Sequence, residues 1–399
     1  MSRNKRIRYT DLIYPVKKIG LVCMSFIMLV QLSCINNASM DKVEVNQVFE
    51  RVAAHDFNPL NEDNSLTLDH AAREAGIPDL NNKDWRIRLL GVRDLVRAGQ
   101  KSMDEILVGL KHPDEHVRQV CAMALGILSS EEGIEGLEQL AREDSSTVVR
   151  SQAIISLGQI ESTGSLDLLN KILAEDPSRD VMHQCELAID QIQKQMGTSK
   201  KQLNAFLRLD ETTFESVKLG KKASDFELQD TEGKTWKLSD FENEKWVVLI
   251  WVFADWCPVC HGEFHELMDL HKLFVKEGIE VFTIEIHDRY RGRVMVGKEL
   301  EPSYWFARES FKEAYTKRIK WPHLLDRAGA VGAKYGIDPL AFAVHAEYIN
   351  RPSTVIVDKE GIVRFLYLGT FWGDRPTIDQ TLDMIQKEEF EFEHPRRRK

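Results

Sequence analysis

The chain has 399 residues, two to three times the length of a typical domain, so we expect at least two domains. Hydrophobic residues make up 43% and charged residues 29%, a globular composition that excludes collagen-like and wholly disordered proteins. The formal net charge of −10 disfavours nucleic acid as a partner, and six cysteines are too few for a disulfide-dense secreted scaffold.

The N-terminus has the pattern of a secretory signal. Basic residues up to Lys18 precede a 14-residue apolar run, Ile19–Leu32, which is short for a membrane span. The run leads into Leu32-Ser33-Cys34, which resembles a bacterial lipobox. We predict a signal peptide over 1–33, lipidation of Cys34, and a lipid-anchored protein in the bacterial cell envelope that faces the periplasm. A signal without lipidation, with Cys34 incidental, is the alternative.

A repeat follows the polar residues 34–81, which we interpret as a tether with short helices such as Leu66–Ala75. Three arginines, 30 and 32 residues apart, each follow an aspartate: Arg88, Arg118 and Arg150. The aspartates suit helix N-caps, and the apolar residues after them recur at helical spacing. The pattern over 82–197 resembles HEAT-like repeats, which implies an all-α solenoid whose helix pairs stack. We expect it to bind another protein or to act as a spacer.

Two glycines and two cysteines in the repeats have simple interpretations. Gly126 and Gly158 stand near the expected helix ends, where we expect each to permit a tight turn. Cys121 and Cys185 fall in segments that look buried, and we interpret them as small core residues.

After a polar linker at 198–216, strands alternate with helices over 217–391, which predicts an α/β domain, and a basic tail covers 392–399. The expected strands are 246–253, 279–287, 323–326, 352–358 and 362–368. The run 246–253 is continuously apolar, as in a central strand buried on both faces. It leads directly into Trp256-Cys257-Pro258-Val259-Cys260 and an amphipathic helix.

The C-terminal region resembles the thioredoxin-like fold, in the redoxin group of TlpA/ResA-type oxidoreductases and AhpC/TSA peroxiredoxins. The resemblance covers about 218–390 and rests on three motifs: Gly220 to Phe226, the W-C-x-x-C, and Pro352 to Gly361. It implies a redox-active disulfide between Cys257 and Cys260, with no cofactor. The helix N-terminus should favour a thiolate at Cys257, the expected nucleophile, which Cys260 would resolve.

The resemblance also assigns supporting residues. Trp256 should shield one side of the cysteine pair, and Pro352 aligns with the cis-proline of these folds. The buried acid that thioredoxin carries six residues before its first cysteine is replaced by Trp251, and we expect the nearby Asp255 to be more exposed. Glu263 is a candidate proton relay or a solvated helix residue.

Two segments look like insertions, 288–302 and 339–350, which form either a lid over the site or loops that pack on the domain. They and the flanking chain contribute Arg291, Arg293, Tyr304, Trp305, Phe306 and His345. His287 ends an expected strand beside the one that precedes the cysteines, so it is expected near them.

We predict an envelope-anchored thiol:disulfide oxidoreductase that acts on protein thiols or disulfides with a membrane redox partner. Four alternatives stay open. The residues Cys257 to His261 also match the c-type haem attachment motif C-x-x-C-H. The two cysteines with His261 and His265 could instead bind zinc. A peroxidase would use Cys260, with Arg351 near its thiolate. In the fourth alternative, the redoxin domain is inactive and the protein acts by binding a partner through its repeats.

Overall fold

The computed structural model describes residues 80, 82, 84–299, 315, 317–339, 342–344, 347–369 and 374–392. All of them belong to one compact unit, Ser65–Lys399. The predicted signal, Cys34, the tether apart from Leu80, and Tyr304, Trp305, Phe306 and His345 lie outside the described residues, as does the tail beyond Phe392. No helix within the described ranges is long and apolar enough to cross a membrane.

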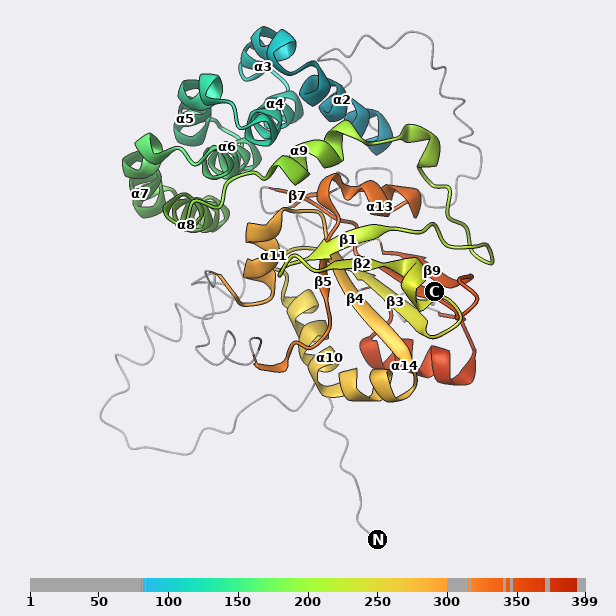
Figure 1. The fold of residues 1–399 in the computed structure, drawn as a ribbon. Helices are drawn as coiled ribbons and strands as arrows, with labels where there is room; N and C mark the ends of the chain where they lie inside the picture. Colours follow the sequence, from blue (N-terminus) through green and yellow to red (C-terminus); the bar gives the residue numbers. More distant parts are fainter. Residues whose placement is uncertain are drawn as a thin grey trace, which may run out of the picture. The chain divides into compact units, whose positions relative to one another are not determined.

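The first described elements are stacked helix pairs, which confirms the HEAT-like solenoid (Figure 1). The inner helices α2, α4, α6 and α8 pack on one another in chain order, and the outer helices pack on them. Their bounds are α2 Trp85–Ala98, α3 Met103–Gly109, α4 Glu115–Leu128, α5 Ile134–Glu143, α6 Thr147–Ile160, α7 Leu166–Glu175 and α8 Arg179–Gln193, with short 3-10 turns η3 Gly99–Ser102, η4 Glu131–Gly133 and η5 Thr163–Ser165.

The repeated aspartates and arginines join neighbouring units. Asp84 and Asp114 cap α2 and α4 as predicted, each accepting a backbone N–H two residues on. Further along, Arg118 donates to both carboxylate oxygens of Asp144 at 2.7 and 2.9 Å. Arg150 does the same to Asp176 at 3.0 and 3.2 Å. The motif therefore ties each unit to the next as well as starting its helix.

The glycines of the repeats do not make the tight turns that we expected. Gly126 and Gly158 lie inside α4 and α6, and neither has a positive φ. A methyl group built on Gly126 would lie 2.0 Å from Gln159 Oε1, and one on Gly158 would lie 3.0 Å from Gln191 Oε1. Each glycine thus leaves room for a glutamine amide from the next unit.

The expected linker at 198–216 is not an open linker. It contains helix α9 Lys200–Leu207 and the 3-10 turn η6 Glu211–Thr213. Thr198 Oγ1 donates to the Gly126 carbonyl in α4, and Arg97 at the end of α2 donates to the Leu207 carbonyl. Phe206 is buried in the solenoid core. The segment runs back across the solenoid because its apolar residues find burial there.

The α/β domain is a mixed seven-stranded sheet of thioredoxin-like fold, in the order β2-β1-β5-β4-β3-β8-β9 (Figure 1). Strands β3, β4 and β5 are parallel, whereas β8 runs antiparallel to β3 with Trp251 opposite Ser353. The strands are β1 Glu227–Asp230, β2 Thr235–Lys237, β3 Trp246–Trp251, β4 Ile279–Glu285, β5 His323–Leu325, β8 Ser353–Val357 and β9 Val363–Leu368; β6 Phe342–Val344 and β7 Glu347–Ile349 form a separate pair.

The helix predicted after the cysteines is present, and the segment 288–302, predicted to be an insertion, contains a helix of its own. Helix α10, Pro258–Lys276, begins directly after the β3 loop, and α14, Ile378–Lys387, starts with a capping box at Thr377. The others are α11 Arg289–Met295 and α13 Ala330–Lys334, with 3-10 turns η7 Leu238–Phe241 and η8 Arg327–Gly329. The central strand β3 is buried along nearly its whole length, so the sheet presents the β3 loop and the start of α10 as one fixed edge.

Candidate redox site

The two cysteines meet at the N-terminus of α10. Cys257 is the N-cap, and its Sγ accepts the Cys260 backbone N–H at 3.3 Å. Cys260 lies one turn into the helix, and its Sγ accepts the Phe253 backbone N–H at 3.3 Å. Both are free thiols with no exposed surface. The pair thus has the proximity that a reversible disulfide needs, inside a closed site.

A buried arginine reaches the second sulfur. Arg375, from the segment before α14, places Nη2 3.6 Å from Cys260 Sγ and donates Nη1 to the Trp251 carbonyl. Its Nε donates to Glu263 Oε1 at 2.6 Å. The side chains of Arg375 and Glu263 are only 1% and 11% exposed, so water screens this charge little. The cation therefore stands beside Cys260.

The electrostatics separate the two thiols. Burial raises the pKa of the Cys257 thiol well above its usual range, and the hydrogen bond to Cys260 raises it further. Burial also opposes ionisation of Cys260, but the hydrogen bond from Cys257 and the charge of Arg375 hold the pKa of Cys260 below its usual value. In this reduced, closed form the structure favours a thiolate on Cys260, whereas the sequence predicted it on Cys257.

The supporting residues are placed as follows. Trp256 is buried, with its ring edge-to-face against Phe253 beside the pair. Glu263 is not a solvated helix residue, because it holds Arg375. Pro352 directly precedes β8, next to the end of β3. The expected cis-proline is wrong: none of the described peptide bonds is cis, and the bond before Pro352 is trans.

Asp255 is buried, contrary to our expectation of exposure. It is 3% exposed, and its Oδ1 accepts Arg291 Nη2 at 2.5 Å. Its Oδ2 lies 3.5 Å from Nε2 of His183, on solenoid helix α8. Burial alone would raise its pKa, but Arg291 and His183 together hold the pKa of Asp255 well below its usual range. A carboxylate two residues before Cys257 is thus stabilised partly by the solenoid.

The insertion at 288–302 supplies this contact between solenoid and sheet. Its helix α11 donates Arg291 Nη1 to Gln184 Oε1 at 2.9 Å and the Tyr290 hydroxyl to Asp190 Oδ2 at 2.8 Å, both on α8. Arg293 instead pairs with Glu299 and Glu232. The segment therefore docks the two domains, a role that sequence reasoning missed because no local pattern marks it.

His261 is engaged on both ring nitrogens. Its Nε2 donates to the Asp255 carbonyl, which can only accept, and Nδ1 lies 2.7 Å from the Tyr315 hydroxyl. Burial lowers the pKa of His261 to about 4, so the neutral ring accepts from Tyr315. Neither nitrogen is available to a haem or zinc ion in this arrangement. Within the described ranges, no three His, Cys, Asp or Glu side chains gather as a metal site.

The other predicted polar residues have different surroundings. Arg351, predicted near a peroxidatic thiolate, donates Nε to the Gly369 carbonyl at 2.6 Å, and the arginine at Cys260 is Arg375. His287 follows β4 and lines a cleft between the solenoid and the sheet domain. Among the chain's 53 lysines and arginines, no motif singles out Arg375.

Known proteins match the two domains separately. Residues 219–366 match the AhpC/TSA family, and residues 77–158 match HEAT repeats. The thiol-disulfide oxidoreductase ResA of Geobacillus thermodenitrificans is 26% identical over 43% of this chain and 80% of its own length. The thiol:disulfide interchange protein DsbE of Vibrio cholerae is 25% identical over 40% of this chain and 70% of its own. Chloroplastic peroxiredoxin Q of Populus jackii is 28% identical over 44% and 71%.

Proposed function

Because the chain carries an AhpC/TSA redoxin domain behind HEAT repeats, we propose that it is a thiol:disulfide oxidoreductase that exchanges disulfides with protein cysteines. One observation carries the proposal: Cys257 and Cys260 lie one helical turn apart, linked by the hydrogen bond from the Cys260 N–H to Cys257 Sγ. A pair in this position can close a disulfide without rebuilding the helix. The likeness to ResA and DsbE supports it.

The two cysteines alone account for the bonds that form and break in the exchange with a client disulfide. The proton that the two sulfurs share moves to Cys260, which leaves a thiolate on Cys257. This thiolate attacks a client disulfide, forms a mixed disulfide and releases one client thiolate. Cys260, once deprotonated, attacks Cys257 Sγ and releases the second client thiolate. The client gains two electrons, and the resulting Cys257–Cys260 disulfide is reduced by a second dithiol, which we assign to a membrane redox partner.

The test is a redox titration of the whole protein in graded dithiothreitol buffers, with free thiols trapped and located by mass spectrometry. We expect one cooperative two-electron transition that joins Cys257 to Cys260. Cys185→Ala is the matched control, because burial raises the pKa of that thiol in the solenoid core and it should not take part. Absence of a Cys257–Cys260 disulfide at every potential would overturn the proposal.

Peroxide reduction is a second candidate, favoured by the 3.6 Å contact between Arg375 and Cys260 Sγ. The Cys260 thiolate would take one peroxide oxygen to form a sulfenic acid and release hydroxide or an alcohol. Cys257 would then displace water and close the disulfide. The test compares two rates: the formation of a Cys260 sulfenic acid in a Cys257→Ser variant, and the reduction of a protein disulfide by the wild-type protein. A faster first rate would favour this candidate. Equal or slower formation supports disulfide exchange.

We further propose that the protein sits in the bacterial envelope on a lipid attached to Cys34. The supporting pattern is the apolar run that ends at Leu32-Ser33-Cys34. Cells that express the full chain should incorporate labelled palmitate, and Cys34→Ser should abolish the label. Incorporation that survives this substitution would contradict the assignment.

A further inference from the structure

A short turn, residues 254–257, carries the chain from the end of β3 to the start of α10. The Cys257 backbone N–H donates to the Ala254 carbonyl at 3.1 Å, so Asp255 occupies a central position of the turn. Cys257 is then the N-cap of α10, and its sulfur accepts the N–H of Cys260. The orientation of this turn therefore sets where the sulfur of Cys257 lies relative to Cys260.

The turn is held at Asp255, through both its backbone and its side chain. His261, near the start of α10, donates Nε2 to the Asp255 carbonyl. The buried carboxylate lies 2.5 Å from Arg291 Nη2 through Oδ1 and 3.5 Å from His183 Nε2 through Oδ2. One residue of the turn is thus in contact with α10, with α11 and with solenoid helix α8.

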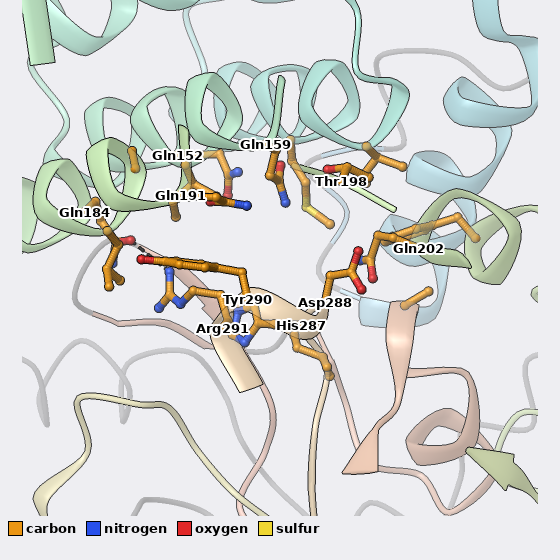
Figure 2. A pocket seen from close by; sticks show the side chains of 18 of the residues that line it. Gln152, Gln159, Gln184, Gln191, Thr198, Gln202, His287, Asp288, Tyr290 and Arg291 are labelled. Atoms are coloured by element: carbon orange, nitrogen blue, oxygen red, sulfur yellow. Dashed lines mark hydrogen bonds between the residues drawn. The ribbon is translucent and has the colours of Figure 1, made fainter. Parts of the chain in front are cut away.

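The solenoid supplies two of these contacts, from adjacent residues of α8. His183 faces the carboxylate directly, and Gln184 Oε1 accepts Arg291 Nη1 at 2.9 Å. Figure 2 shows Arg291 extending from α11 toward Gln184. His183 and Gln184 are each 1% exposed, so water screens these contacts little. A change at α8 is therefore transmitted to the turn through Asp255.

We propose that His183 and Gln184 on the solenoid are positioning residues that lower the reduction potential of the cysteine pair. They act through Arg291 and Asp255, which hold the turn that carries the first cysteine. Helix α8 is thereby part of the redox centre. The inference rests on the proposed function, since it concerns the potential of the same pair.

The effect follows from the entropy of closing the disulfide. In that step two thiols form one S–S bond, and their two electrons and two protons pass to a client disulfide, which becomes two thiols. A fixed turn keeps the two sulfurs oriented for this step, so less conformational freedom is lost when the bond forms. The disulfide is then more stable, and the reduced pair is a stronger reductant for clients.

The experiment measures the reduction potential of the whole protein in graded dithiothreitol buffers, with trapped thiols located by mass spectrometry. The variant His183→Leu with Gln184→Leu removes both solenoid contacts. It keeps the ion pair of Arg291 with the carboxylate, so the buried carboxylate retains its closest cation. The matched control is Tyr290→Phe, which removes a hydrogen bond from α11 to Asp190 on the same solenoid helix and keeps the contacts at the turn.

We expect the equilibrium constant for closing the disulfide to fall about tenfold in the double variant, which raises the potential by about 30 mV. Tyr290→Phe should keep the wild-type potential although it weakens the same docking contact. His183→Gln, whose amide can still donate to the carboxylate, should also stay close to the wild-type value. A double variant that is less stable but has an unchanged potential would show that these residues only hold the domains together.

The outcomes separate this inference from the proposed function. If the wild-type protein forms no disulfide between Cys257 and Cys260 at any potential, the proposed function is wrong, and the assigned effect on the potential is wrong with it. If the wild-type disulfide forms but the double variant shifts its equilibrium constant less than about twofold, or Tyr290→Phe shifts it equally, only the positioning role is refuted.

Hydrogen exchange of the Cys257 amide gives a second readout that needs no redox reaction, because this N–H donates to Ala254 within the turn. Exchange should be faster in the double variant and unchanged in Tyr290→Phe. Equal exchange in the wild-type protein and the double variant would contradict the positioning role whatever the potential.

Discussion

Two buried arginines flank the cysteine pair, and they act on different partners. Arg375 comes from the redoxin domain itself and contacts both Glu263 and the sulfur of Cys260. Arg291 comes from the docking helix α11, is held by the solenoid, and binds the carboxylate of Asp255. Arg375 therefore stabilises a thiolate and affects reactivity. Arg291 stabilises a buried carboxylate and helps to hold the two domains together.

The largest expected effect is at Arg375. Replacement of Arg375 by Met should raise the pKa of Cys260, because burial is then opposed by the hydrogen bond from Cys257 without the charge of the arginine. An ultraviolet titration of the thiolate should show less than about a tenth of the wild-type signal at neutral pH. Arg375→Lys should restore part of it, and Arg364→Met, which removes an exposed arginine, should change nothing. An unchanged Cys260 titration would show that the hydrogen bond from Cys257 suffices.

Arg375→Met also leaves the Glu263 carboxylate without its ion-pair partner in the interior, and this lowers the free energy of unfolding. A paired variant, Arg375→Met with Glu263→Gln, should recover most of the unfolding free energy because no buried charge is left alone. It should not recover the thiolate. Recovery of both properties together would mean that the arginine acts only through folding.

The second effect is at the domain contact. Arg291→Met leaves Asp255 buried without its closest cation, and we expect a loss of about 3–5 kcal/mol in unfolding free energy. Urea unfolding followed by near-ultraviolet and far-ultraviolet circular dichroism should then split into two transitions, because α8 keeps only the Tyr290–Asp190 hydrogen bond of the two that it makes with α11. His183→Gln should give a smaller loss of the same kind. A single transition in Arg291→Met would show that apolar packing joins the domains.

The third effect is a pH dependence at His261. Its pKa of about 4 in the folded protein, against 6.5 in an unfolded chain, means that the unfolded chain binds the proton better. Stability from this group is full above pH 6.5 and falls by about 3 kcal/mol toward pH 4. Asp326, whose pKa burial raises to about 6 from 3.8, acts in the opposite direction over nearly the same window.

The two dependences therefore nearly cancel in the native chain. His261→Gln should remove one of them, so the variant should gain stability relative to the native protein as the pH falls from 7 to 4.5. Urea unfolding at both values measures this. A constant difference between variant and native protein across that range would show that His261 is not held neutral.

The smallest effect concerns the arginines that join the solenoid units. Arg118→Met removes a largely buried ion pair with Asp144, in which the two side chains are 14% and 4% exposed, and should cost about 1–2 kcal/mol. Lys222→Met, at an exposed pair with Glu242, is the control and should cost less than about 1 kcal/mol. Equal losses would mean that the repeated pairs set alignment more than stability.

Sequence reasoning succeeded where structure is local. The helix caps at Asp84 and Asp114, the buried strand β3 and the cysteines at the start of α10 all follow from residues within one element. It failed where a contact joins distant parts of the chain. Arg375 lies 115 residues after Cys260, and His183 lies on another domain from Asp255. Periodicity and spacing carry no signal for such pairs.

Two local interpretations also failed for a tertiary reason. Gly126 was predicted to end a helix, but its lack of a side chain serves the amide of Gln159 from the next unit. The polar segment at 198–216 was predicted to be a linker, but Phe206 finds an apolar surface on the solenoid. In both cases the local residue preferences were interpreted reasonably, but packing against a neighbouring part of the solenoid determined the structure.

The return of α9 across the solenoid limits how this protein can change its length. Repeat arrays usually gain and lose whole units easily, because each unit touches only its neighbours. Here the segment from Thr198 to Leu207 is tied to α4 at one end and to α2 at the other. A unit added between α2 and α4 would lengthen that span by about 10 Å, or about seven helical residues, and would require a matching insertion in α9. Duplication at this place should therefore be tolerated poorly, so we expect the solenoid to gain units there only together with a longer α9.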